Sequence, residues 1–145
     1  MAKRYPACIL ATAVVPWTED WRFDERLFRR EVEMLLASGL QQLYIFGTAG
    51  EGYAVTDAQF LEIARVFVDA MRAGGAEPMV GVISLSLPTI VARIEAAREL
   101  GVRQFQISLP SWGALNDDEL VAFFDAVPVT KRVCQQVASV GARPQ

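Results

Sequence analysis

The sequence predicts an α/β chain built from parallel strand and helix units. Short apolar runs alternate with segments whose apolar residues recur at helical spacing. The runs begin near residues 7, 43, 79 and 104, at intervals of 36, 36 and 25 residues, which suit a strand, a crossover helix and the next strand. The hydrophobic share of 52% against 21% charged residues is sufficient for a packed core. Four such units in succession predict a parallel sheet covered by helices.

The first unit is a strand followed by a helix. Residues 7–15 carry no charge and several β-branched side chains, which predicts a buried strand that ends at Pro16. Residues 24–38 predict a helix, and Gly39 follows it as a left-handed cap. The apolar residues of this helix fall on one face: Phe28, Val32, Leu35 and Leu36.

The second unit contains the most distinctive turn of the sequence. Residues 43–46 predict a strand, and residues 47–53, here called the glycine loop, follow it directly. Thr56 and Gln59 then form a capping-box pattern, which predicts the start of a helix because both side chains can satisfy free backbone amides. The apolar stripe of that helix consists of Phe60, Ile63, Ala64, Phe67 and Met71.

The third and fourth units repeat the pattern. Residues 79–83 predict a strand, Pro88 fits the first turn of the next helix, and Gly101 ends that helix. Residues 104–108 predict the fourth strand, and Asn116 is placed to cap the fourth helix. The expected buried faces of these two helices are Ile90, Ile94 and Ala97, and Leu120, Phe123, Phe124 and Val127.

Two architectures share this order of elements. A small, open, doubly wound sheet fits a chain of 145 residues. A (β/α)8 barrel takes about 250 residues, so the chain would supply half of one. Periodicity alone does not choose between them.

Composition excludes several kinds of chemistry. Histidine is absent, which rules out imidazole triads, cysteine–histidine dyads and histidine metal sites. Cys8 and Cys134 are too few to hold a metal cluster, so we expect neither a metal nor a cofactor. Nothing in the sequence indicates secretion, and we expect a reduced, cytoplasmic setting.

Charge and hydropathy argue against a membrane or nucleic-acid partner. The apolar run at residues 7–10 is shorter than the roughly seven residues that a leader peptide needs. The longest uncharged stretch, Met34 to Gly50, contains a serine and two glutamines, which is unlike a membrane span. The net charge is −3 and the basic residues are scattered, so no footprint for nucleic acid or an anionic membrane is present.

The charge balance changes sharply near residue 128. Residues 1–127 hold all 17 acidic residues and 11 of the 14 basic ones, whereas residues 128–145 hold three basic residues and no acidic one. We therefore divide the chain into 1–127 and a basic tail, 128–145.

The glycine loop has two interpretations. A glycine-rich turn at the carboxyl end of a parallel strand exposes backbone N–H groups, which form a concave site for a carboxylate or phosphate. Alternatively, the glycines are there only because a tight turn needs positive φ. The loop does not fit a dinucleotide fingerprint, because its glycines are spaced Gly-x-x-Gly-x-Gly and no strand-end acid follows at the right distance.

The residues of the glycine loop resemble the dihydrodipicolinate synthase and N-acetylneuraminate lyase family of class I aldolases. That family carries Gly-Thr-Thr-Gly-Glu or Gly-Ser-Thr-Gly-Glu after its second strand, where this chain has Gly47 to Glu51. The resemblance covers roughly residues 6–127 and includes the first strand ending at Pro16 and the segment Leu109 to Trp112. It implies the N-terminal half of a TIM (β/α)8 barrel for residues 1–127, with 128–145 as an unmatched basic tail.

The resemblance also implies a substrate-binding site. In the family, two hydroxyl residues of the second-strand motif hold the carboxylate of pyruvate or a related 2-oxo acid, which forms a Schiff base with a lysine on the sixth strand. Thr48 matches the first hydroxyl residue, and Ala49 occupies the position of the second, where only its N–H remains. Trp112 falls where the synthases place a relay tyrosine, and an indole cannot relay a phenolic proton.

No catalytic residue is assigned. Lys3 precedes the first strand and Lys131 lies in the basic tail, so neither matches the Schiff-base position, and no Tyr-Asn-x-Pro motif follows the fourth helix. We expect a truncated or frame-shifted member of an aldol-type lyase family that is inactive alone. The alternatives are a noncatalytic carboxylate-binding or oligomerising α/β module, and an enzyme completed by another half-barrel. Unpaired strand edges lead us to expect a homo-oligomer.

The remaining polar and aromatic candidates have structural interpretations. Glu51 is expected to brace the turn and the helix that follows, and residues 117–119 to act as helix-start acids. Ser84 and Ser86 are left open between a pocket and a loop. For the tryptophans we expect core packing: Trp17, Trp21 and Trp112.

Overall fold

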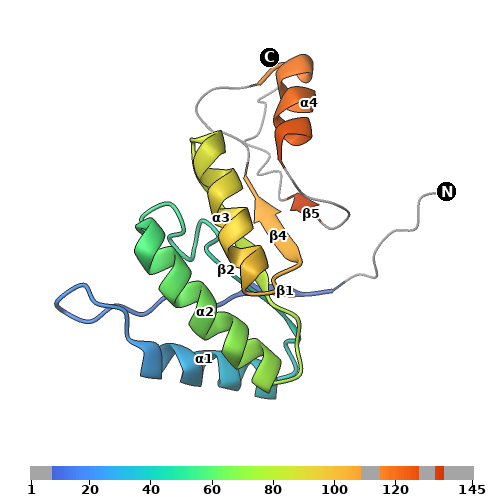
Figure 1. Ribbon diagram of the computed structural model, residues 1–145. Coiled ribbons are helices and arrows are strands. Elements are labelled where there is room, and N and C mark those ends of the chain that lie inside the picture. Colours follow the sequence, from blue (N-terminus) through green and yellow to red (C-terminus); the bar gives the residue numbers. More distant parts are fainter. Residues whose placement is uncertain (1–7, 109–114, 128–132, 136–145) are drawn as a thin grey trace, which may run out of the picture.

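Five parallel strands form one sheet in the order β1-β2-β3-β4-β5 (Figure 1). The computed structural model describes residues 8–108, 115–127 and 133–135. The strands are β1 (Leu10–Thr12), β2 (Gln42–Ile45), β3 (Met79–Gly81), β4 (Gln104–Ile107) and β5 (Val133–Gln135). Each strand is hydrogen-bonded to the next strand along the chain, with no reversal of the order. A doubly wound sheet requires a switch point where the order reverses, so the structure favours the barrel-type winding.

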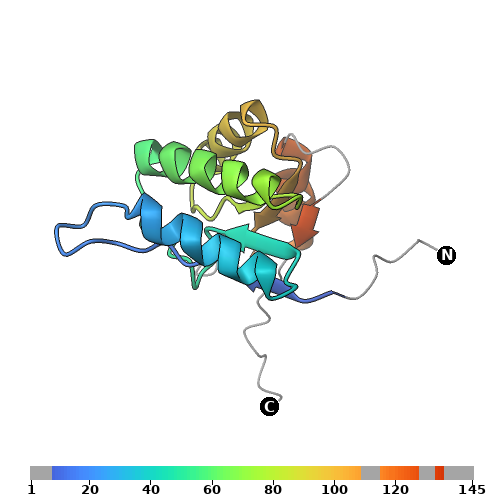
Figure 2. The ribbon, with the colours of Figure 1, turned by 90° about the horizontal axis from the view of Figure 1, so that it is seen from below.

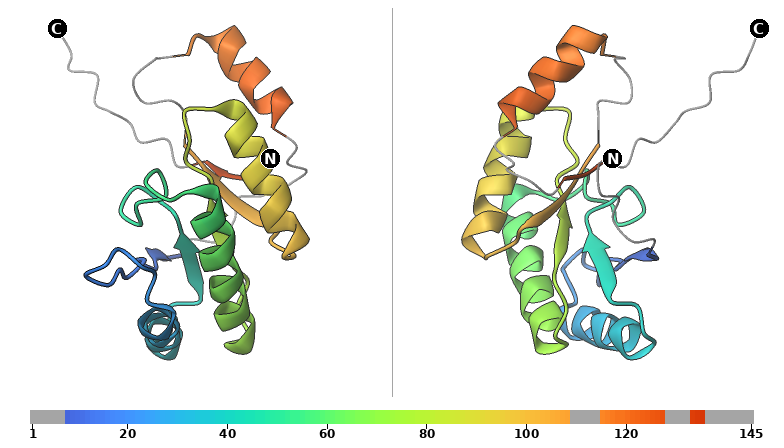
Figure 3. Two further views of the ribbon diagram at one scale, coloured as in Figure 1. Left: turned by 60° about the vertical axis from the view of Figure 1, so that its left-hand side comes forward. Right: turned by 90° about the vertical axis from the view of Figure 1, so that its right-hand side faces the viewer.

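Four helices connect these strands. They are α1 (Glu25–Ala37), α2 (Asp57–Ala73), α3 (Leu87–Glu99) and α4 (Asp117–Ala126). Helices α1, α2 and α3 lie on one side of the strands (Figure 3), and α1 and α2 run side by side (Figure 2). All four helices and the four strands predicted from periodicity are present, with β1, β3 and β4 shorter than their predicted runs. The expectation that the first strand is buried was wrong, because β1 is only partly buried and Ile9 and Val14 beside it are exposed.

The core lies between the sheet and the helices. The predicted apolar faces of α1, α2 and α3 are buried, except for Leu35, which is half-buried. Helix α4 differs, because none of its residues is fully buried. Of its predicted face, Leu120, Phe123 and Phe124 are half-buried, and Val127, which follows the helix, is buried. The largest side chains with almost no exposed surface are Phe28, Phe46, Phe60, Phe67, Phe105, Leu43, Ile45, Ile63, Met71, Ile90, Ile94 and Ile107.

Side-chain caps start each helix. Thr56 and Gln59 form the predicted capping box of α2, and Asn116 forms the corresponding box at α4 with Glu119. At α3 the cap is Ser86, whose Oγ accepts a hydrogen bond from the backbone N–H of Thr89 at 3.3 Å. The backbone of Ser86 is in turn held by Ser84 Oγ at 3.1 Å. The two serines left open by the sequence are therefore local loop and cap residues.

One feature lies outside the predicted units. Strand β5 falls within the segment expected as a basic tail, and Ile107 of β4 is in register with Gln135 of β5.

Trp21 is 80% exposed with a φ of +59°, so the expectation of core packing was wrong for this residue. Trp17 is partly buried and packs against the core, as expected. Among the described residues, no helix has the length and apolar character needed to cross a membrane.

Candidate functional site

The residue immediately before the glycine loop has a strained backbone. Phe46 follows β2 with a φ of +60°, a left-handed conformation that is rare for a bulky side chain. Its side chain is fully buried and stacks on Phe60 with ring centroids 4.9 Å apart. This packing holds the residue in place against a conformational cost of about 1–3 kcal/mol. Strained backbone of this kind is concentrated at binding and catalytic sites.

The glycines of the loop are required by close approach. None of Gly47, Gly50 and Gly52 has positive φ; instead Phe46 and Glu51 do. A β-carbon on Gly52 would collide with the carbonyl of Phe46, and one on Gly47 would collide with the ring of Tyr44. The interpretation that these glycines serve positive φ is therefore wrong. They let the loop fold back against its own strand.

The folded loop leaves three backbone donors free. Within it, the Glu51 N–H donates to the Thr48 carbonyl at 3.2 Å, and the Gly52 N–H donates to the Gly47 carbonyl at 3.3 Å. Over the part of the chain that the structure describes, the N–H groups of Thr48, Ala49 and Gly50 donate no hydrogen bond. Thr48 and Ala49 are also exposed. Consecutive free N–H groups on a turn are the usual backbone element of anion sites.

Two buried polar atoms at this end of the sheet have no hydrogen-bond partner. One is the hydroxyl of Thr12 on β1, which lies 3.5 Å from the position that a β-carbon on Gly50 would take. The other is Oε1 of Gln106 on β4, which faces Gly81 in the register of β3 and β4. The amide nitrogen of Gln106 donates to Ser108 Oγ at 3.0 Å, which orients the side chain. Two buried polar atoms near the carboxyl edge of the sheet therefore have unused hydrogen-bonding capacity.

The predicted site residues divide into two groups. Thr48 and Ala49 lie together in the loop, with exposed side chains and free N–H groups. Trp112 and both lysines lie outside the described residues. Glu51 takes part in the turn through its backbone, accepting from the Ala54 N–H at 2.8 Å. Among the described residues, no group of three or more acidic or cysteine side chains is arranged to hold a metal ion.

One residue beside the loop, Arg93, was not predicted from the sequence. Arg93 on α3 is 7% exposed, and its guanidinium bonds to the loop and to the first residue of α2. A signal was present in the sequence: Arg93 falls at helical spacing from Ile90 and Ala97, which are buried. An arginine on the apolar face of a helix has to find buried acceptors.

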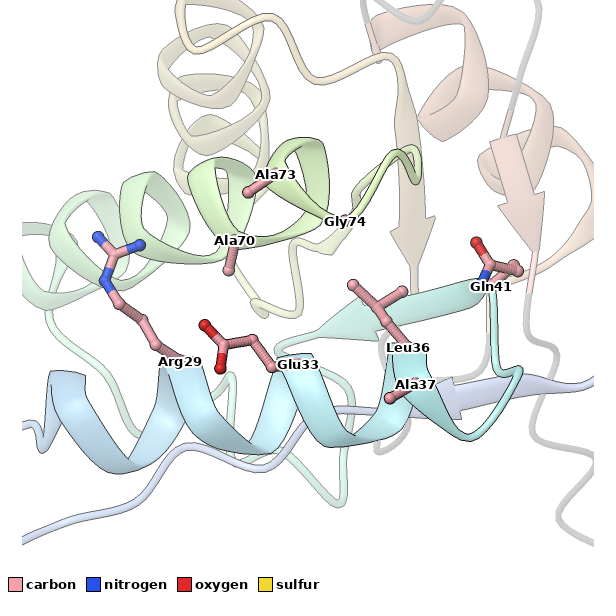
Figure 4. Close-up of a pocket in the computed structure, with 8 residues that line it drawn as sticks. All are labelled: Arg29, Glu33, Leu36, Ala37, Gln41, Ala70, Ala73 and Gly74. Carbon is pink, nitrogen blue, oxygen red and sulfur yellow. The ribbon is translucent and has the colours of Figure 1, made fainter.

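A surface groove of about 440 Å³ lies away from this loop, between α1 and α2 (Figure 4). It is lined by Arg29, Glu33, Leu36, Ala37, Gln41, Ala70, Ala73 and Gly74. Gln41 precedes β2 and Gly74 follows α2, so the groove lies at the amino end of the strands. Parallel barrels bind substrates at the carboxyl end, and we therefore place the candidate site at the glycine loop.

The fold and the loop define a class of protein: successive parallel βα units with a glycine-rich turn, which carries free N–H groups, at the carboxyl edge of the sheet. The model of the Dihydrodipicolinate synthetase family matches residues 6–135, and the chain belongs to this family. The predicted family and the predicted fold, the N-terminal half of a TIM barrel, are confirmed. The matched range continues past residue 127 and includes β5.

Named relatives agree with this assignment. The 4-hydroxy-tetrahydrodipicolinate synthase of Desulforudis audaxviator is 26% identical over 135 residues, covering 93% of this chain and 46% of the relative. The synthase of Rhizorhabdus wittichii is 30% identical over 113 residues, covering 77% of this chain and 38% of the relative. The structure of YagE from E. coli K12, a family member in complex with pyruvate, matches with a TM-score of 0.82 at 18% identity, covering 88% of this chain and 43% of that one. The chain spans less than half the length of these relatives.

Proposed function

We propose that the glycine loop binds the carboxylate of a small 2-oxo acid such as pyruvate. The observation that carries the proposal is the set of free, consecutive N–H groups at Thr48, Ala49 and Gly50, where Thr48 and Ala49 are exposed and Gly50 is buried. Two or three such donors stabilise a carboxylate by charge-assisted hydrogen bonds. The pyruvate complex of the E. coli family member supports this choice of ligand.

The side chains at the loop modify this site. The Thr48 hydroxyl supplies one further hydrogen bond, and Ala49 supplies none beyond its backbone, so this chain binds the carboxylate more weakly than a chain with two hydroxyl residues. Trp112 remains a predicted contact on the family's positional pattern. The free hydroxyl of Thr12 beside Gly50 offers another polar group at the same edge of the sheet.

We further propose that residues 1–145 bind the 2-oxo acid without forming a Schiff base. The family chemistry is aldol-type cleavage or synthesis through a lysine, as the resemblance implies. The chain has lysines only at positions 3 and 131, on either side of the four predicted βα units. None of the strands β1 to β5 therefore contains a lysine whose amine could form the Schiff base.

The test uses the purified chain with pyruvate and borohydride. We expect saturable shifts of the amide signals of Thr48, Ala49 and Gly50 on titration with pyruvate, and no reduced covalent adduct by intact mass. Acetate and glycerol are the controls, because the first keeps only the carboxylate and the second has none. Absence of any pyruvate-dependent shift would contradict binding by the loop. A stoichiometric adduct on either lysine would contradict the noncatalytic proposal.

We also propose that the chain self-associates through its first strand. Strand β1 has a single neighbour in the sheet, and Ile9 beside it is 73% exposed. An open edge next to an apolar side chain favours pairing with another strand. Light scattering coupled to size exclusion tests this: we expect a dimer or larger species for the wild type and a shift toward monomer for Ile9→Lys. A monomeric wild type would contradict it.

A further inference from the structure

Arg93 joins two loops at the carboxyl edge of the sheet. Its Nε donates to Asp57 Oδ1 at 3.0 Å, and its Nη2 donates to the carbonyl of Val55 at 2.9 Å. Its Nη1 donates to the carbonyls of Gly52 at 3.1 Å and of Ile83 at 3.4 Å. Gly52 and Val55 belong to the connection between β2 and α2, and Ile83 to the connection between β3 and α3. One guanidinium thus holds both connections.

The side chain is fixed from a third direction by an aromatic ring. The guanidinium carbon lies 5.1 Å from the centroid of the Phe60 ring, in a cation–π arrangement. Phe60 itself stacks on Phe46, the residue immediately before the glycine loop. The contacts of Arg93 therefore reach the loop at both ends: through a ring pair at its start, and through carbonyls at and beyond Gly52.

The bond to Gly52 acts on the turn itself. The N–H of Gly52 closes the turn on the carbonyl of Gly47, and the carbonyl of Gly52 accepts from Arg93. Both polar groups of Gly52 are therefore fixed, two residues after the segment that carries the free donors. Fixing Gly52 restrains the end of the turn on which those donors lie.

Arginine is suited to this arrangement and lysine is not. Four acceptors in different directions need a planar group with several donors, which the guanidinium provides. Three of the four acceptors are neutral carbonyls. The fourth is the carboxylate of Asp57, whose side chain is 77% exposed. Removing the guanidinium leaves these carbonyls without their donor. While it is present, its bonds fix the positions of the groups that accept them.

We propose that Arg93 is the positioning residue of the carboxylate site: it sets the affinity of the glycine loop for a 2-oxo acid without touching the ligand. The proposal rests on the proposed function of the loop. Under this proposal, a side chain on α3 orders Thr48, Ala49 and Gly50, which lie in the connection between β2 and α2.

The experiment compares Arg93→Met and Arg93→Lys with the wild-type chain. Arg65→Met is the matched control, since Arg65 is an exposed arginine on α2. Pyruvate affinity is measured by amide shift titration, and amide hydrogen exchange is measured for residues 47–55 and for the strands. We expect Arg93→Met to weaken pyruvate binding about tenfold and to accelerate exchange about tenfold in 47–55 alone, with Arg93→Lys intermediate and Arg65→Met unchanged.

The two readouts separate a positioning role from a merely structural one. If the role of Arg93 were merely structural, Arg93→Met would accelerate exchange in β2, β3 and the loop together. It would also leave the pyruvate affinity of the folded fraction unchanged. Either result would overturn the proposal. If Arg93→Met does not fold, Arg93→Lys keeps the charge and the apolar stem and is judged by the same criteria. Failure of the wild type to bind pyruvate would overturn the proposed function, while unchanged exchange in 47–55 would overturn the role of Arg93 itself.

Discussion

The carbonyl oxygen of Phe46 lies so close to Gly81 that a β-carbon on residue 81 would overlap it. The oxygen is turned toward β3 because Phe46 adopts its left-handed conformation at the end of β2. The conformation that opens the glycine loop therefore depends on a glycine in the neighbouring strand. The amide oxygen of Gln106 would also lie only 2.9 Å from that β-carbon.

Gly81→Ala is expected to destabilise the fold. The new methyl group meets backbone, which cannot move aside as a flexible side chain does, and overpacking of this kind costs about 1–3 kcal/mol. Urea unfolding followed by circular dichroism measures the change. Gly74→Ala is the control, because its β-carbon would meet chiefly the end of the Leu36 side chain, which can shift. Equal losses for the two variants would show that the Phe46 contact is not the cause.

Ala49→Thr is expected to tighten pyruvate binding about fivefold, since one additional hydrogen bond contributes about 1 kcal/mol. Ala49 is exposed, so the larger side chain fits without repacking. The amide titration with pyruvate measures the change in Kd. Ala54→Thr, an exposed position in the same connection, is expected to bind as the wild type does. Unchanged or weaker binding by Ala49→Thr would place the ligand away from this residue.

Removing the amide of Gln106 is expected to cost little stability. Its Oε1 is buried without a partner, and an unsatisfied buried acceptor costs about 1–3 kcal/mol, which an apolar replacement recovers. The double variant Gln106→Leu with Ser108→Ala removes both ends of their hydrogen bond, and we expect a free energy of unfolding within about 1 kcal/mol of the wild type. Gln104→Leu on the same strand is the control. A much larger loss would mean that Oε1 is satisfied in the folded chain.

Asp57→Asn is expected to lower the free energy of unfolding by less than about 1 kcal/mol, because its carboxylate is 77% exposed and solvent screens the pair. Arg93→Met should cost more, since it leaves three carbonyls without their donor. Thermal and urea unfolding of the two variants gives the comparison. A larger loss of unfolding free energy from Asp57→Asn would show that Arg93 stabilises the chain mainly through its ion pair and not through its carbonyl bonds.

The helices could be predicted well because their signals are local. Thr56 with Gln59, and Asn116 with Glu119, form the boxes that their spacing predicts, since each box involves only one turn of the chain. The spacing of apolar residues likewise predicted the buried faces of α1, α2 and α3. The winding of the sheet could not be predicted in this way, because it depends on which strands pair, and periodicity carries no such information.

The candidate site was predicted only in part. Thr48 and Ala49 followed from the motif, whereas the reason for the glycines did not, because it depends on the carbonyl of Phe46 approaching residues from two other segments. The contacts of Arg93 span 36 to 41 residues along the chain for Asp57, Val55 and Gly52. Such contacts exist only once the units are packed, and no local pattern reports them.

The order of strands in the sheet has a consequence for how the chain acquires its structure. Within the described sheet, each strand pairs only with its neighbours in chain order, so the strand contacts join consecutive βα units. The paired residues nevertheless lie 25 to 35 positions apart, from Met79 with Gln104 to Tyr44 with Met79, and closing such long connections makes parallel sheets slow to form. Because no connection skips a strand, each new unit can add to the one before it without waiting for a more distant segment.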